Sequence, residues 1–120
     1  MKYLTTLALF ILTLSLSAEN KPLVESQEEV QKLASADFEK SMSAPDGELY
    51  LFGQANHIEG TYKFKVTLGD KGRVTSIFVI GREGGSIQMQ NKVKDAVKET
   101  KFSFKLPKNK DYSLEYKFSF

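Results

Sequence analysis

The chain has 120 residues, of which 41% are hydrophobic and 27% are charged, a balance that excludes collagen-like, disordered and coiled-coil proteins. It has no cysteine and one histidine, which excludes disulfide frameworks, thiol nucleophiles and histidine-cluster metal sites. The formal net charge of +2 is too small to indicate non-specific nucleic-acid binding. We expect one folded domain that needs no metal or cofactor.

The first eighteen residues have the three-part pattern of a secretory signal. Met1 and Lys2 give a positive start, an uncharged leucine-rich run covers 4–16, and small residues follow at Ser17 and Ala18. A membrane-spanning helix needs about 20 apolar residues, and this run is shorter. The pattern therefore favours a cleavable signal over 1–18 rather than an uncleaved anchor. An exported chain without cysteine is typical of the bacterial periplasm.

The next part of the chain, 19–59, is predicted to hold one helix and a connector. Residues 19–25 are polar and indicate a flexible lead-in. Ser26 and Glu29 form a capping box, which predicts a helix over 26–42 because apolar residues then recur at helical spacing, at Val30, Leu33, Ala34, Phe38 and Met42. A turn at 44–47 ends it. Residues 48–53 indicate a short strand or a loop that covers the core.

Residues 60–120 are predicted to hold three strands and a helix. Strict alternation predicts strands over 61–68 and 111–120, and a glycine-bearing turn at 69–72 indicates a hairpin. The returning strand, 73–80, alternates imperfectly. Either a bulge shifts its phase near Ser76, or helices cover both of its faces.

A second helix is predicted over 87–101, after a loop at 81–85 and a cap at Ser86. Residues 102–107 are an extended exit segment, because Pro107 disfavours helical geometry at the residue before it. The element order is helix, optional short strand, strand, strand, helix, strand. We therefore expect an α+β fold with two layers, in which helices pack on an antiparallel sheet of three strands, or four with the optional one.

Charge is unevenly distributed between the two parts of the chain. Residues 19–59 have nine acidic residues and three lysines, whereas 60–120 have thirteen basic and six acidic residues. The halves either attract each other or present a basic face to an acidic partner. The lysines of such a basic face would be Lys92, Lys98, Lys101, Lys105 and Lys108.

No constellation of catalytic residues stands out. His57 has no marked partner for nucleophilic catalysis, and the paired acids Glu28 and Glu29 suit a helix N-terminus. The glycines of 81–86 lack the Lys-Ser/Thr ending of a phosphate loop. A small hydrolase or a hydrolase inhibitor is a further interpretation, but a hydrolase would need convergent polar groups that the sequence does not mark. We expect a protein that is not an enzyme.

The last strand carries lysine in a fully alternating pattern, as strands at sheet edges do. An edge strand can also take up an extended peptide of a partner as an additional strand.

Residues 60–120 resemble the C-terminal domain of TonB-type proteins. The matching pieces occur in order: the alternating strand 62–68, Gly-Arg-Val-Thr at 72–75, Gly-Gly-Ser at 84–86 before a helix, the exit segment 102–107, which resembles the family's Phe-x-Pro exit, and the aromatic closing strand 116–120. With 3 prolines, no long spacer and a cleavable-looking signal, the chain looks like a stand-alone relative rather than an energy transducer.

The resemblance implies a periplasmic binding module that docks a protein or peptide by adding a strand beside its last strand. The docking residues would be Tyr112, Ser113, Leu114, Glu115, Tyr116 and Lys117. The alternative function is binding of a cell-envelope polymer such as peptidoglycan through the basic face, which salt would weaken. Homodimerisation through edge strands is a further option.

Overall fold

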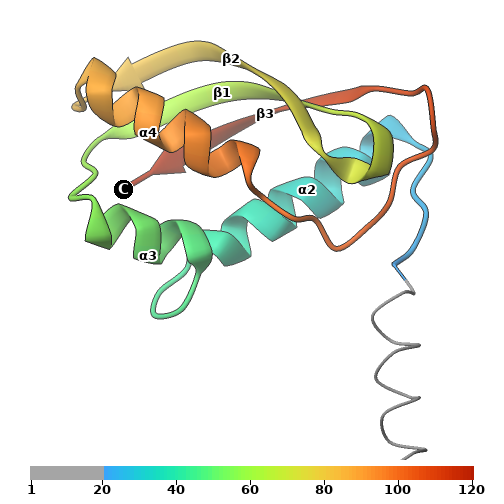
Figure 1. The fold of residues 1–120 in the computed structure, drawn as a ribbon, viewed down its shortest axis with the longest axis horizontal. Coiled ribbons are helices and arrows are strands. Elements are labelled where there is room, and N and C mark those ends of the chain that lie inside the picture. The colour runs from blue at the N-terminus through green and yellow to red at the C-terminus, as the bar shows by residue number, and fades with distance from the viewer. Residues whose placement is uncertain (1–20) are drawn as a thin grey trace, which may run out of the picture.

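The computed structural model describes residues 21–120, so the predicted signal over 1–18 lies outside the described residues. The elements in chain order are α2 (Gln27–Ser41), α3 (Glu48–Ala55), β1 (Thr61–Leu68), a 3-10 turn (Asp70–Gly72), β2 (Val74–Glu83), α4 (Ile87–Lys98) and β3 (Tyr112–Ser119). The three strands form an antiparallel sheet in the order β2-β1-β3, and the helices pack against it (Figure 1). The predicted α+β fold is confirmed. Among the described residues, no helix combines the length and apolarity that crossing a bilayer requires.

The alternation of β1 separates a buried face of the sheet from an open one. Tyr62, Phe64 and their even-numbered neighbours are fully buried, whereas Lys63 and Lys65 are exposed. Side chains of a strand point to opposite faces in turn, so this pattern places the helices on one face and solvent on the other.

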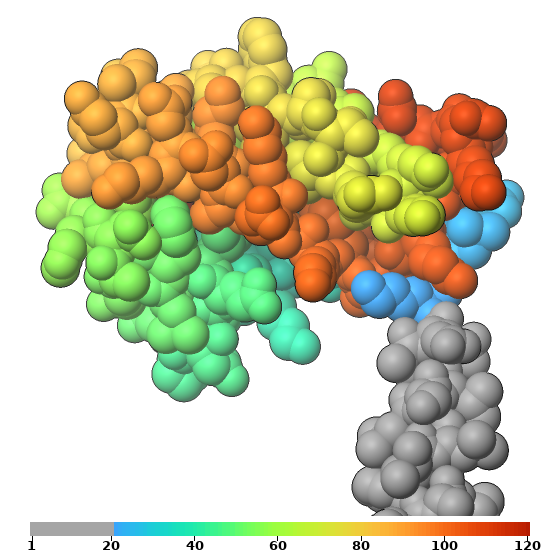
Figure 2. All heavy atoms as spheres, viewed as in Figure 1, coloured from blue at the N-terminus to red at the C-terminus, as the bar shows by residue number. Residues whose placement is uncertain are grey.

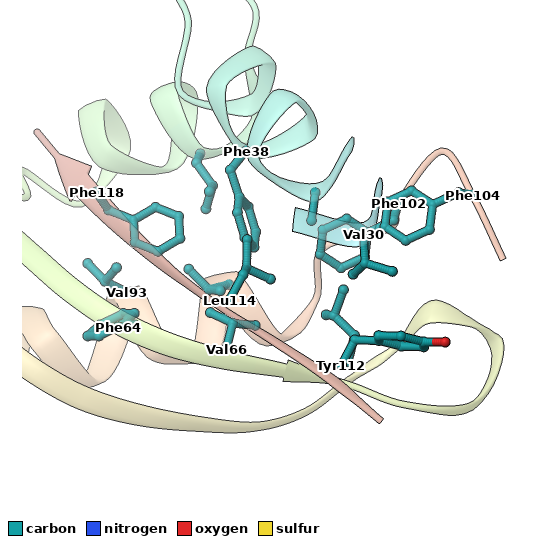
Figure 3. Close-up of a cluster of buried hydrophobic side chains, with 14 of the residues drawn as sticks. Val30, Phe38, Phe64, Val66, Val93, Phe102, Phe104, Tyr112, Leu114 and Phe118 are labelled. Carbon is teal, nitrogen blue, oxygen red and sulfur yellow. The ribbon is translucent and has the colours of Figure 1, made fainter. Parts of the chain in front are cut away.

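The core lies between the sheet and the helices. Figure 3 shows Phe38 and Val30 of α2 facing Phe64 and Val66 of β1 and Phe118 of β3. Val93 and Val97 of α4, together with the exit segment, also belong to this cluster. Residues before and after position 60 therefore share one hydrophobic core.

The start of α2 follows the predicted capping box, but the lead-in before it is held in place rather than flexible. The Ser26 side chain accepts a hydrogen bond from the Glu29 N–H at 3.1 Å. Over the described residues 21–25, Leu23 forms a parallel bridge with Lys105, and Val24 is buried. Figure 2 shows the lead-in (blue) against the exit segment. The lead-in was predicted to be flexible because most of its residues are polar, and this composition gave no sign that Val24 would be buried in the core.

Residues 48–53, expected to form a short strand or a loop, belong to α3 instead. Leu, Glu, Gln and Ala favour helices, and this segment has no β-branched residue. Leu49 and Gly53 lie one helical turn apart and are both buried. A Cβ added at Gly53 would lie 2.6 Å from the Phe120 ring, so the close approach of the C-terminal aromatic requires glycine there.

Two β-bulges explain the imperfect alternation of β2. The β1–β2 register shifts between Thr67 and Leu68, opposite Ser76, and again between Lys63 and Phe64. The first shift matches the predicted bulge near Ser76. The alternative, helices on both faces, is wrong because β1 exposes its lysines on the open face. After the second shift β2 continues to Glu83, into the segment expected to be a loop.

The Gly84–Gly85 turn has a packing role. A Cβ at Gly85 would lie 1.9 Å from the Tyr62 hydroxyl oxygen, so only glycine leaves room for that side chain. The hydroxyl donates to the Glu59 carbonyl at 2.5 Å. Burial raises the pKa of Tyr62; nearby Arg82 opposes this shift and Glu59 adds to it.

Candidate functional site

The six predicted docking residues lie together in β3, which forms one edge of the sheet. They divide between its two faces. Tyr112 and Leu114 are buried and Tyr116 is half-buried, whereas Glu115 and Lys117 are exposed. A partner added beside β3 would therefore meet its backbone and the open-face side chains, and the inward side chains would anchor the strand.

Backbone groups of alternate β3 residues point away from the sheet. The Phe120 N–H donates to the Gly60 carbonyl at 3.0 Å, and this pair continues the β1–β3 register. Hydrogen-bonded pairs alternate in an antiparallel ladder. The even-numbered residues of β3 therefore bond to β1, whereas Ser113, Glu115, Lys117 and Ser119 direct their N–H and C=O groups outward.

One end of this edge is already covered by the chain itself. The Gln27 side-chain amide donates to the Ser113 carbonyl at 2.6 Å, as a neighbouring strand would. The Tyr112 hydroxyl donates to the Glu25 carbonyl at 2.7 Å. Within residues 21–120, no other hydrogen bond to an outward backbone group of β3 is found. The available edge therefore runs from Glu115 to Ser119.

Below this edge, β3 rests on an aromatic cluster. The Phe38 ring lies 5.2 Å from that of Tyr116 and 5.0 Å from that of Phe118, and the latter two rings are 4.8 Å apart. Burial raises the pKa of Tyr116, and Glu39 adds to the shift. Tilted and edge-on aromatic pairs stabilise packing beyond the area they bury. The core side of β3 near Tyr116 and Phe118 is therefore packed against α2.

The open face beside the edge has a mixed but mainly positive charge. Lys63 Nζ lies 3.5 Å from Glu115 Oε1, and Lys63 is also directly opposite Lys117. These residues border a shallow hollow of about 580 Å³ that reaches from β3 to the Gly81–Glu83 end of β2. Like charges directly opposite destabilise a sheet, so an acidic group placed between the two lysines would relieve their repulsion.

The five lysines of the predicted basic face are all exposed but do not line a common hollow. Lys92 borders a hollow between α3 and α4 together with Glu48, Asp95 and Glu99. Lys101 borders another hollow, which also has carboxylates at Asp37, Asp46 and Glu48. Lys98 is near the end of α4, and Lys105 and Lys108 lie on the connection to β3. Acidic side chains of 19–59 therefore dilute the positive charge at two of the five positions.

Sequence reasoning missed the residues that join 19–59 to the candidate site. Besides Gln27, Asp37 accepts hydrogen bonds from the Ser103 N–H at 2.9 Å and from its hydroxyl at 3.0 Å. Both residues lie on the polar side of a helical pattern, where nothing distinguishes them from solvated neighbours. The described residues include no cluster of His, Asp or Glu suited to a metal ion.

Comparison of the chain with protein-family models, with curated proteins and with solved structures gave no match.

Proposed function

We propose that this protein is a non-catalytic binding module of the bacterial periplasm, which takes up an extended segment of a protein partner as a fourth strand beside β3. The observation that carries the proposal is the regular β3 edge. Its pairing with β1 runs through eight residue pairs without a bulge, and within residues 21–120 no hydrogen bond reaches its outward backbone groups from Glu115 to Ser119. An extended peptide uses such groups for affinity and alternate side-chain contacts for specificity.

Two further features support the proposal. Residues 61–119 contain strand, strand, helix, extended exit and strand, the same order as the pieces on which the resemblance to TonB C-terminal domains rests. The open-face charges at Lys63, Glu115 and Lys117 would select the partner's side chains, with an acidic residue favoured opposite the two lysines.

The affinity from the backbone alone would be modest. Three outward residues, Glu115, Lys117 and Ser119, offer one N–H and one C=O each. A typical hydrogen bond contributes a net free energy of about 1 kcal/mol, and ordering the peptide opposes this gain. Side-chain contacts on the open face must therefore supply much of the specificity.

The proposal is tested with the variant Glu115→Pro and its matched control Glu115→Ala. Proline removes the outward N–H of residue 115 and leaves the bonds from β3 to β1, and prolines are tolerated on the free side of edge strands. Alanine keeps that N–H and, like proline, lacks the Glu115 carboxylate, so the two variants differ at the backbone. Leu114 is unsuitable because its N–H belongs to the inner ladder and its side chain is buried.

The immobilised protein is incubated with bacterial envelope extract at low and at high salt, and the retained proteins and glycans are identified. We expect a protein that wild type and Glu115→Ala retain at high salt, and that Glu115→Pro loses while its circular dichroism spectrum stays folded. Equal retention by the proline variant would refute strand addition at β3. Retention of glycan alone, lost at high salt, would favour polymer binding through the lysines instead.

A further inference from the structure

The opposite edge of the sheet, formed by β2, is chemically unlike β3. Its residues 74–81 carry no charge, and two of its large apolar side chains are exposed, Phe78 at 68% and Ile80 at 41%. Natural edge strands are usually protected by charges or proline against pairing with other chains. Exposed apolar residues on an unprotected edge indicate a surface that another strand covers.

The backbone of β2 defines a short regular stretch for such pairing. Since even-numbered residues of β1 bond to β3, its odd-numbered residues bond to β2, and Lys65 is paired with Phe78. The residues on either side of Phe78, Ile77 and Val79, therefore direct their N–H and C=O groups outward. The two register shifts lie on either side of this stretch and limit it to Ser76–Val79.

We infer that β2 pairs antiparallel with β2 of a second copy of this chain, around a two-fold axis at Phe78, so that two sheets join into one of six strands. In this register Ile77 of each copy lies opposite Val79 of the other, and both residues have outward groups, which yields four hydrogen bonds. The two Phe78 side chains meet on the open face as a non-hydrogen-bonded pair, the kind in which side chains approach most closely.

Charge complementarity argues for a second copy rather than an unrelated peptide. The same two-fold register brings Arg73, just before β2, toward Glu83 at its other end in the partner copy, and both side chains are exposed. The contact occurs twice by symmetry. An interface of this kind uses the same surface on both copies, so it consumes both β2 edges and closes at a dimer.

The inference goes beyond the proposed function and does not depend on it, because β3 stays free in the dimer. It is tested by sedimentation equilibrium of the purified protein and two variants. Phe78→Lys places two positive charges opposite each other at the axis. Leu51→Lys is the matched control, since Leu51 is exposed at 50% but lies on α3. We expect a wild-type dimer whose dissociation constant rises at least ~10-fold in Phe78→Lys and is unchanged in Leu51→Lys.

The register is tested separately by charge reversal. Arg73→Glu and Glu83→Arg should each weaken the dimer, and the double variant should restore it, because the two residues meet only across the axis. A protein that stays monomeric over the accessible concentrations, or a dimer insensitive to Phe78→Lys, would overturn the inference. A dimer that the double variant fails to restore would overturn the register centred on Phe78.

Discussion

Truncation of Phe38 to alanine tests whether the N-terminal helix is part of the support of the β3 edge. Phe38 lies in α2, is fully buried, and contacts aromatic rings from two other parts of the chain. Its ring lies 5.3 Å from Phe102 of the exit segment, and 5.2 and 5.0 Å from Tyr116 and Phe118 of β3. No other ring pair among the described residues links a helix to β3.

The expected loss of stability follows from the burial of this ring. Truncating a buried phenylalanine to alanine removes about 3–5 kcal/mol from the free energy of unfolding, through lost transfer energy and the cavity left behind. Three aromatic partners place Phe38 at the upper end of that range. A domain of this size has about 5–15 kcal/mol of stability in total, so the variant should fold but be close to its limit.

Urea unfolding followed by circular dichroism measures the effect, and Leu51→Ala provides the matched control. Leu51 is half-exposed on α3, so its truncation should change the free energy of unfolding by less than about 1 kcal/mol. A loss below about 1 kcal/mol in Phe38→Ala would refute the reasoning, because 19–59 would then contribute little to the core around β3.

Three further changes have expected outcomes. Gly53→Ala should destabilise the fold by about 1–3 kcal/mol in thermal unfolding, since its Cβ would lie 2.6 Å from the Phe120 ring, whereas Gly81→Ala, with no atom within 4 Å of its Cβ, should be nearly neutral. Gln27→Ala removes the side chain that covers one outward carbonyl of β3, so affinity for the partner peptide, measured by calorimetry, should rise, and a fall would contradict the proposed edge. The free energy of unfolding should fall as the pH rises above 10, because burial raises the pKa of Tyr62 and the unfolded chain releases its proton first. Urea titrations at several pH values should show a weaker alkaline loss in Tyr62→Phe, and an equal loss would contradict this assignment.

The strands were predictable because their alternation is a local signal. The residues of β1 and β3 alternate strictly, and each strand was found within one residue of its expected bounds. The helix at 48–55 was missed because a short apolar run has no clear period, so the weak helix preference of its residues did not decide between helix, strand and loop. The contact of Gly53 with Phe120 joins residues far apart in the sequence, so no local pattern could reveal that packing.

For the candidate site, the sequence indicated the strand but not its limits. Lysine and strict alternation identified β3 as an edge, and the sheet order agrees. The Ser113 carbonyl is bonded by the Gln27 side chain, a contact between residues far apart in the sequence. Gln27 lies in the capping box of α2, where a polar residue is expected in any case, so its position does not suggest a contact with β3. The β2 edge was missed for a different reason. Its imperfect alternation was consistent with either a bulge near Ser76 or cover on both faces, and neither alternative indicated that apolar side chains such as Phe78 would be exposed on the open face.

The contrast between the two edges explains how one small sheet could hold two different partners. β3 is regular, and its outward backbone groups lie beside the charged side chains of Glu115 and Lys117 on the open face. β2 carries no charge over 74–81 and is bulged on either side of Ser76–Val79, so an extended segment can pair with it regularly only over that short stretch. A peptide suited to the β3 edge carries complementary charge and would leave that charge opposite apolar side chains such as Phe78 at the β2 edge. Each edge therefore disfavours the other's partner, and strand addition at β3 and self-pairing at β2 can occur in the same molecule.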